Sequence, residues 1–493
     1  MKFQKQISLC IVLILLFSMM LTACGQDVPE TPDTPDTTGT PATTSASVIV
    51  APEPLDAEEV TLHVLAENPG MMGKNAMLVK LIDKTIRAVE ADFDGLAFEV
   101  EYLPSDEMER AAELDIIRDE IAAGGGPDIF LFTRSQPSFM PFASENIILE
   151  PLFPDVTTAM DAGVFADISE FYNADTQLDK DSFAGGVMEA GAIGNARYVL
   201  PLRYNFPVAY VDMTKFADTG LSTDIFSSGG NALLHTLVEN EVPVCVESGK
   251  DPFRAMAFSL LPDALVEDDL VDYLTQYQIL LPSLEAESYT TSISRFVNDP
   301  ELNMYWGYND FSPLCVQFGT LDIAVEQAAL AQAVGMDLGM FPIIRDDGTL
   351  VADITMYGAV NANCLQAEAA YRFIASFLTK ESQWEIQITG NGVSLDGRMM
   401  AEGYPVLAKG SAEAVFTIAN IGREGSEMQE AVNALEITDE DVPILATDVQ
   451  ARFPTWAEVD LNRKMKNLLD TPAAEIPTIV QVWFQIRASQ NLQ

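Results

Sequence analysis

The stretch from Val60 to Phe132 constrains the fold most, because strand-like and helix-like patterns alternate along it. Residues 60–66 alternate apolar and polar side chains, which predicts a strand, and residues 98–102 repeat this pattern. Residues 128–132 form an almost unbroken apolar run, as in a strand buried on both faces of a parallel sheet. Apolar residues between the first two strands share one helical face: Leu78, Leu81, Ile82, Ile86 and Val89.

A second helix is predicted between the second and third strands. Ser105, Asp106 and Glu107 supply an N-cap and an acidic first turn, and the helix runs to about Ala123. The order strand, helix, strand, helix, strand predicts an α/β fold with a ligand crevice at the carboxyl ends of its strands. We therefore expect residues 68–72 and 133–139 near any site.

The N-terminus has the pattern of a secretory signal. Lys2 and Lys5 precede an uncharged run from Ser8 to Leu21, which is short for a helix that must cross about 30 Å of hydrocarbon. Residues 21–25, Leu-Thr-Ala-Cys-Gly, resemble the lipobox of bacterial lipoproteins. The resemblance implies a signal peptide over residues 1–23 and a diacylglycerol on Cys24; a plain signal peptide or an uncleaved anchor is the alternative.

Residues 24–59 are rich in Thr, Pro and Asp and lack apolar periodicity until their end, which predicts a disordered linker. The folded part would thus be tethered to a membrane through its N-terminal lipid. Acidic side chains outnumber basic ones 74 to 27. This excess argues against a nucleic-acid partner, because phosphate binding relies on Lys and Arg clusters.

Little in the sequence points to metal or nucleophilic chemistry. His63 and His235, the two histidines, have no HExxH or cysteine-pair neighbourhood, so no metal and no cofactor is expected. Three cysteines are predicted to be small buried residues: Cys245, Cys315 and Cys364. Gly124 to Gly126 lack the Lys-Ser/Thr of a phosphate loop and predict a helix stop, and Asp346-Asp347-Gly348 predicts a β-turn rather than a calcium loop.

Several patches resemble the sugar-type extracellular solute-binding proteins of ABC importers, known as family 1. Leu149 to Leu152 matches a "Leu-x-Pro-Leu" turn after a Pro-Asp strand, and residues 194–201 resemble a "Gly-Lys-x-Tyr-Gly-Leu-Pro" strand without its Lys. Residues 210–212, Tyr-Val-Asp, stand where the family has "Tyr-Tyr-Asn-Lys". Residues 334–343 and the apolar helical stripe around Phe373 follow in the family's order.

The resemblance implies a periplasmic-binding-protein-like fold of type II, with two α/β lobes joined by a multi-crossing hinge. Lobe 1 is expected over residues 60–203 plus 318–352, and lobe 2 over residues 204–317 plus 353–493. The implied protein is a monomer that captures a small solute, a mono- or oligosaccharide, and delivers it to ABC permease subunits. It would be lipid-anchored at the extracellular face of a bacterium with a single membrane.

Solute-binding residues of this family combine rings that stack on sugars with polar groups that bind hydroxyls. The densest such cluster is residues 303–311, and just past the first implied crossing lie Tyr204 and Asn205. Tyr357 is expected to pack in the core, Arg134 could instead pair with a carboxylate, and the 303–311 cluster could be an ordinary aromatic loop. The predicted ligand-binding residues are Trp306, Tyr308, Asn309, Asp310, Tyr204, Asn205, Thr133, Arg134 and Gln136.

Two other functions stay open from the sequence. A secreted glycosidase would need two carboxylates about 5 to 9.5 Å apart, and 74 acidic residues allow such a pair. A ligand-sensing lipoprotein for a signalling partner is the second alternative. Neither has a motif in the sequence, so we expect a binding protein and not an enzyme.

Overall fold

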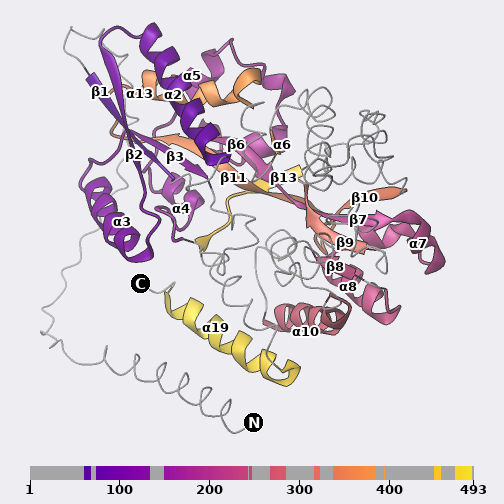
Figure 1. Cartoon of the computed structure of the whole chain (residues 1–493). Coiled ribbons are helices and arrows are strands. Elements are labelled where there is room, and N and C mark those ends of the chain that lie inside the picture. Colours follow the sequence, from indigo (N-terminus) through magenta and orange to yellow (C-terminus); the bar gives the residue numbers. More distant parts are fainter. Residues whose placement is uncertain are drawn as a thin grey trace, which may run out of the picture. The chain divides into compact units, whose positions relative to one another are not determined.

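A computed structural model describes the part of the chain that follows the predicted linker (Figure 1). The described residues are 60–67, 74–133, 149–242, 244–246, 267–284, 316–321, 337–383, 393–394, 449–456 and 472–490. The signal peptide, Cys24 and the linker lie outside them. The predicted α/β class is confirmed, since helices pack on two separate sheets of seven and four strands.

The first sheet has the order β12-β6-β11-β3-β1-β2, with β13 pairing to β11. Its strands β1, β2 and β3 are parallel, whereas β11 runs antiparallel to both β3 and β6. The bounds are β1 (Val60–Ala66), β2 (Leu96–Tyr102), β3 (Ile129–Thr133), β6 (Val199–Asn205), β11 (Leu350–Val360), β12 (Val393–Ser394) and β13 (Val449–Arg452).

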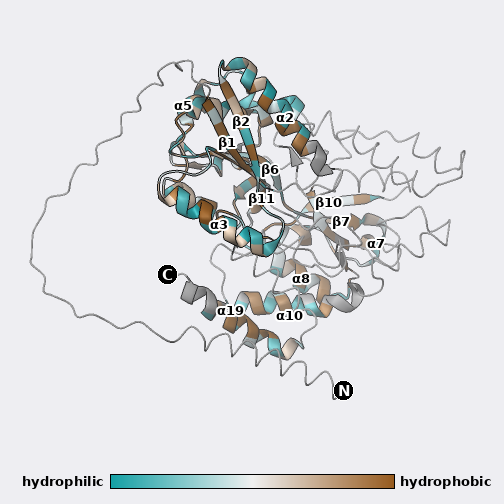
Figure 2. Ribbon diagram, turned by 60° about the vertical axis from the view of Figure 1, so that its left-hand side comes forward, coloured by the Kyte–Doolittle hydropathy of each residue, from teal (hydrophilic) through white to brown (hydrophobic). Residues whose placement is uncertain are grey.

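Helices α2 and α3 lie on opposite sides of β1 and β2 (Figures 1 and 2). Right-handed crossovers require this, because the chain steps from β1 out to β2 and then back past β1 to β3. Asp106 caps α3 as predicted, accepting hydrogen bonds from the amides of Met108 and Glu109. The helices around this sheet are α2 (Lys74–Asp92), α3 (Glu107–Ala122), α4 (Val156–Asp161), α5 (Ser169–Ala174), α6 (Gly185–Glu189) and α13 (Ala367–Ala375), with the 3-10 turns η1 (Lys180–Ser182) and η6 (Ser376–Leu378).

The second sheet has the order β10-β7-β9-β8 and its own helices. A small hairpin of β4 (Ala192–Ile193) and β5 (Ala196–Arg197) stands apart from both sheets. The strands are β7 (Pro207–Asp212), β8 (Val244–Val246), β9 (Val316–Thr320) and β10 (Leu338–Pro342). The helical elements that follow in the chain are α7 (Met213–Asp218), η2 (Thr223–Ser227), α8 (Gly230–Glu239), α10 (Glu267–Leu284), η9 (Ala473–Glu475) and α19 (Ile476–Gln490).

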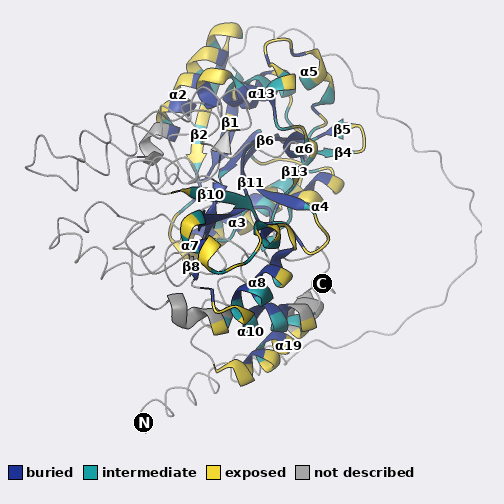
Figure 3. Ribbon diagram, turned by 90° about the vertical axis from the view of Figure 1, so that its right-hand side faces the viewer, coloured by how far each residue is buried: buried dark blue, intermediate teal, exposed yellow. Residues whose placement is uncertain are grey.

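Strand β7 lies between two hydrophobic cores. Val208 and Tyr210 pack into the core of the first sheet, whereas Ala209 and Val211 pack into that of the second. Successive side chains of a strand point to opposite faces, so β7 presents one face to each core. All six of its residues are buried, as are all those of β6 and β11, the dark strands in Figure 3.

The chain crosses between the sheets at narrow places. Phe206 alone separates β6 from β7, and residues 343–349 connect β10 to β11. The two crossings are adjacent, because Asn205 pairs with Asp353 on one side and Val208 with Pro342 on the other. A third crossing follows β13, where Phe453 packs in the first core and Trp456 against the second.

The two sheets divide the later segments differently from the expected lobes, which were 60–203 plus 318–352 and 204–317 plus 353–493. Strands β9 and β10, within residues 316–342, belong to the second sheet, whereas β11, α13 and β13 belong with the first. Strand β6 also continues through Tyr204 and Asn205, past the expected boundary at residue 203. A strand buried on both faces carries no local signal for which sheet it joins, and β11 joins the first because it pairs with three of its strands.

Two other local predictions, the helix stop and the β-turn, are confirmed, whereas the predicted full burial of Cys364 is not. Gly124 and Gly126 end α3 with φ values of 85° and 87°, which glycine adopts readily. Residues 346–348 form a turn, closed by a hydrogen bond of 2.9 Å from the Gly348 amide to the Arg345 carbonyl. Cys364 is only half-buried, and burial together with the nearby Asp128 charge raises the pKa of its thiol to about 12. The side chains of Cys245 and Cys315 lie outside the described residues.

Candidate functional site

The carboxyl ends of β3 and β6 lie beside the middle of β11, at one edge of the first sheet. Thr133, the last residue of β3, pairs with Met356, and Met356 pairs on its other side with Arg203 of β6. Tyr204 and Asn205 follow directly. The structure therefore places the predicted site residues Thr133, Tyr204 and Asn205 along one edge, which we call the crossing edge.

The other six predicted ligand-binding residues lie outside the described residues: Arg134, Gln136, Trp306, Tyr308, Asn309 and Asp310. Their part in the site stays a prediction. Thr133 is half-buried at the end of its strand, directly before this undescribed segment.

Tyr204 is fully buried, and its hydroxyl has no hydrogen-bond partner. Its ring stacks on Phe206, the single residue of the first crossing, with centroids 6.4 Å apart. Burial raises the pKa of this phenol well above its usual range, so the group stays neutral. An unpartnered buried hydroxyl costs free energy in a folded protein, which is why such a group at a crossing between sheets is of functional interest.

Asn205 has a structural role in the first crossing. Its side-chain carbonyl accepts a hydrogen bond of 3.0 Å from the Phe206 amide, and the residue is 4% exposed. This contact satisfies a backbone donor at the point where the chain leaves β6. Asn205 thus shapes the crossing, a role that its amide side chain alone did not predict.

Glu67 and Arg110 form a buried ion pair at the same edge. Glu67 comes directly after β1, and its two carboxylate oxygens accept hydrogen bonds of 2.7 and 2.9 Å from Arg110. Arg110 is 2% exposed and also donates to the carbonyls of Pro104 and Glu150, at 3.1 and 2.6 Å. Such a bidentate pair neutralises both charges and fixes their geometry.

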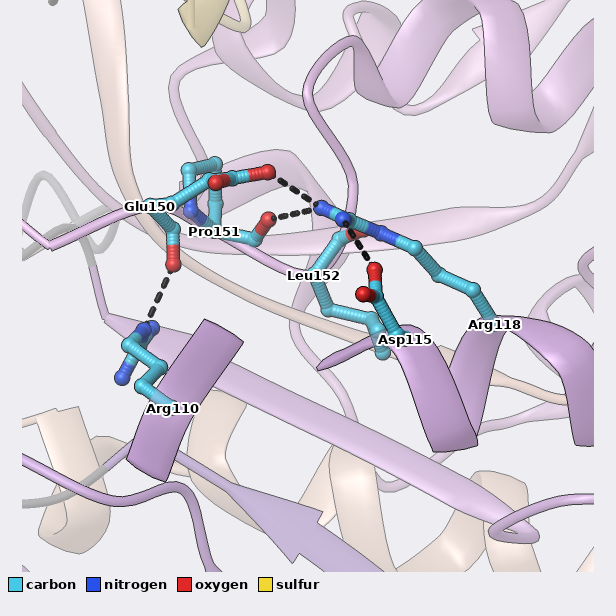
Figure 4. Close-up of polar contacts among 6 residues, drawn as sticks. All are labelled: Arg110, Asp115, Arg118, Glu150, Pro151 and Leu152. Carbon is cyan, nitrogen blue, oxygen red and sulfur yellow. Dashed lines mark hydrogen bonds and ion pairs between the residues drawn. The ribbon is translucent and has the colours of Figure 1, made fainter. Parts of the chain in front are cut away.

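Two arginines of α3 hold the segment that returns from the undescribed residues 134–148 (Figure 4). Arg110 binds the Glu150 carbonyl, and Arg118 binds the carbonyls of Pro151 and Leu152 at 2.9 and 3.1 Å. Arg118 also binds the Glu150 carboxylate at 2.8 Å. The two arginine side chains therefore attach the predicted "Leu-x-Pro-Leu" turn to α3 (Figure 4).

Tyr357 connects this ion pair to an aromatic cluster. Its ring lies edge-on to Phe132 and to Phe453, with centroids 5.9 and 5.3 Å apart, so the predicted packing role is confirmed. Burial raises the pKa of its phenol, and the Glu67 charge raises it further. Tyr357 thus stays protonated beside the carboxylate.

Two more polar groups stand where β11 passes β6. Asp353 accepts a hydrogen bond of 3.2 Å from the Arg452 guanidinium of β13. Thr355 lies at a register shift between the two strands, and its buried hydroxyl has no partner. The crossing edge thus combines paired charges with two unpartnered hydroxyls, those of Tyr204 and Thr355. Within the described ranges, no group of three or more His, Cys, Asp and Glu is arranged to hold a metal ion.

Substitutions of two tyrosines, on the consecutive strands β6 and β7, test whether the Tyr204 hydroxyl has a hydrogen-bond partner. We expect Tyr204→Phe to raise the free energy of unfolding by about 1 kcal/mol without solute, because it removes an unpartnered buried polar group. Tyr210→Phe is the matched control: its hydroxyl donates to the Thr320 carbonyl at 2.7 Å, so its loss should destabilise by about 1 kcal/mol. Urea denaturation measures both, and equal destabilisation by the two changes would show that the Tyr204 hydroxyl is bonded.

Comparison with known proteins gives matches in structure alone. No family model matches the chain, and no curated protein matches its sequence. A galacto-N-biose/lacto-N-biose I-binding protein of an ABC transporter from Bifidobacterium longum is 12% identical, covering 88% of this chain and 98% of its own, at a TM-score of 0.49. A sugar transporter structure from Rhizobium etli is 17% identical, covering 86% and 99%, at 0.48.

A solute-binding protein from Agrobacterium radiobacter, solved with ribitol, is 14% identical and covers 88% of this chain and 99% of its own, at a TM-score of 0.46. These similar structures are consistently extracellular solute-binding proteins or sugar-binding proteins of ABC transporters, at low identity.

Sequence reasoning missed the Glu67–Arg110 pair. The available signal was the register of α3, in which Arg110 shares a buried stripe with Leu114 and Ile117. An arginine in a buried helical stripe needs a buried acceptor, and Glu67 stands at the end of the neighbouring strand.

Proposed function

We propose that this protein is a solute receptor that captures a small molecule between its two sheets and performs no chemistry on it. One observation carries the proposal: polar groups gather at the crossing edge, including a fully buried Tyr204 hydroxyl that has no partner. This edge lies next to two of the crossings between the sheets, Phe206 and residues 343–349. Bending at such crossings is the usual means by which two-lobed receptors close on a ligand.

A neutral, hydroxyl-rich solute fits this edge best. The charged groups there, Glu67 with Arg110 and Asp353 with Arg452, already neutralise one another. A carbohydrate offers hydroxyls that both donate and accept, which would suit the hydroxyls of Tyr204 and Thr355 once bending between the sheets exposes them. The aromatic and polar residues 303–311 would supply rings for stacking on the sugar.

We further propose that the receptor is anchored at the extracellular membrane face through a diacylglycerol on Cys24 and delivers its solute to an ABC permease. The lipobox-like residues 21–25 and the Thr/Pro-rich linker support this proposal. In the part of the chain that the structure describes, no helix is long and apolar enough to span a bilayer. Mass spectrometry of the mature N-terminus would show whether Cys24 carries the lipid.

A thermal-shift screen against oligosaccharides, polyols, amino acids and peptides tests the binding function. A solute present at about 100 times its dissociation constant should add about 2.7 kcal/mol to the free energy of unfolding. The Tyr204→Phe variant should lose part of this shift, because its ring remains but its hydroxyl does not. No shift with any class would contradict the receptor, and a new product in the mixtures would favour an enzyme.

A further inference from the structure

Helix α8 is capped by a residue from a distant part of the chain. Its N-cap, Gly229, has no side chain to accept the free amides of the first turn. The carboxylate of Asp346 takes that role and accepts a hydrogen bond of 3.0 Å from the Asn231 amide, 115 residues away in sequence. Because the amino end of a helix carries partial positive charge, a carboxylate stabilises it.

Gly229 makes room for this contact. Its φ of +95° lies where side-chain-bearing residues are strained. A Cβ at this position would lie 2.5 Å from the Asp346 carboxylate and 2.7 Å from the Asp346 Cα. The glycine therefore serves both the turn into α8 and the close approach of Asp346.

Asp346 belongs to a turn that is held by hydrogen bonds among its own residues. The Arg345 amide donates to the Thr349 carbonyl at 2.8 Å, and the Gly348 amide donates to the Arg345 carbonyl at 2.9 Å. Asp347 accepts hydrogen bonds from the Thr349 amide and hydroxyl, at 2.9 and 2.6 Å. Residues 345–349, the crossing turn, thus form one compact unit.

The crossing turn stands between the two sheets. Before it, Ile343 is buried in the second core and its amide donates to the Pro207 carbonyl at 3.0 Å. After it, Leu350 is buried in the first core and pairs with Val449 of β13. The Asp346 bond to α8 therefore attaches the middle of this crossing to the second sheet's helices.

We propose that Asp346 fastens the crossing turn to α8, so that residues 338–349 move as one body with the second sheet. Bending between the sheets is then confined to the Thr349–Leu350 junction, to Phe206 and to the crossing that follows β13. The biological role of this attachment rests on the proposed receptor function. The experiments that test the attachment do not depend on that function. Loss of the cap would free a longer hinge and loosen the two sheets relative to each other.

Hydrogen exchange in the absence of any solute tests the cap itself. In Asp346→Ala, the first-turn amides of α8 should exchange about fivefold faster, which corresponds to the usual strength of a cap. In Asp346→Asn, which keeps an acceptor oxygen, the increase should be smaller. Asp347→Ala is the matched control, and there the α8 amides should exchange as in the parent protein. Unchanged α8 exchange in Asp346→Ala would overturn the proposal.

Coupling between two sites is reciprocal, so a change at the start of α8 should alter hydrogen exchange in the crossing turn. Gly229→Ala places a Cβ against Asp346 and should speed exchange of the Gly348 amide. Gly220→Ala is the control, because Gly220 also has a positive φ but no atom within 4 Å of an added Cβ. Equal exchange of the Gly348 amide in both variants would contradict the attachment.

Distances between spin labels test the hinge. Ala112 on α3 and Glu239 on α8 are exposed, and replacing both with p-acetylphenylalanine allows labelling without touching the cysteines. We expect a broader distance distribution in Asp346→Ala than in Asp347→Ala; equal widths would overturn the confined hinge. The labels are measured without solute, so a failed solute screen would not affect the hinge result. Equal distance widths, in turn, would not contradict the binding proposal.

Discussion

Arg110→Ala is expected to lower the free energy of unfolding by about 3 to 5 kcal/mol, the usual cost of breaking a buried ion pair from one side. The Glu67 carboxylate would keep its buried position while losing both of its hydrogen bonds to the guanidinium. The carbonyls of Pro104 and Glu150 would lose their donor at the same time. Urea denaturation followed by circular dichroism measures the change.

Two companion variants separate this effect from a general loss of charge. Arg87 on α2 is exposed, so Arg87→Ala should change stability by less than about 0.5 kcal/mol. Combining Arg110→Met with Glu67→Gln should recover part of the loss, because neither buried charge is then left alone. An Arg110→Ala cost below about 1 kcal/mol would mean that the pair does not hold this edge.

Gly186→Ala is expected to cost about 3 kcal/mol. Gly186 lies in α6 where the helix passes β13, and an added Cβ would stand 1.9 Å from the Val449 carbonyl oxygen. The contacted atom belongs to the backbone of a paired strand, so a rotamer change cannot relieve the clash. Strand β13 would have to shift along with its pairing to β11.

The neighbouring Gly185 is the matched control. A Cβ there would meet no atom within 4 Å, and its backbone is helical. Gly185→Ala should therefore be neutral or stabilise by up to about 1 kcal/mol, because alanine favours helix. Thermal and urea unfolding of the two variants gives the comparison, and similar costs would argue against the tight contact at Gly186.

The first half of the first sheet could be predicted from local patterns. The apolar stripe of α2, the Asp106 cap of α3 and the apolar run of β3 each depend on neighbours within a few residues in the chain. The sheet membership of β11 could not be predicted, because its unbroken apolar run fits the middle of either sheet. Pairing partners far apart in sequence decided it.

Three of the predicted site residues lie together at the crossing edge, whereas their contact with a solute stays a prediction. The rule that ligands bind at the carboxyl ends of parallel strands led to Thr133, and the resemblance led to Tyr204 and Asn205. The ion pair at the same edge was missed because 74 acidic residues offer Arg110 no unique partner in the sequence. The side-chain carbonyl of Asn205 accepts a hydrogen bond from the Phe206 amide, and its predicted contact with solute stays a prediction.

Strand β7 has a consequence for how the described part of the chain unfolds. Val208 and Tyr210 contribute to one core and Ala209 and Val211 to the other, so removing this strand would expose both cores at once. Unfolding of one core would therefore expose apolar side chains of the other. We expect the two cores to unfold cooperatively because both include β7. The motion between the sheets must therefore bend the chain beside β7 and leave the strand itself in place.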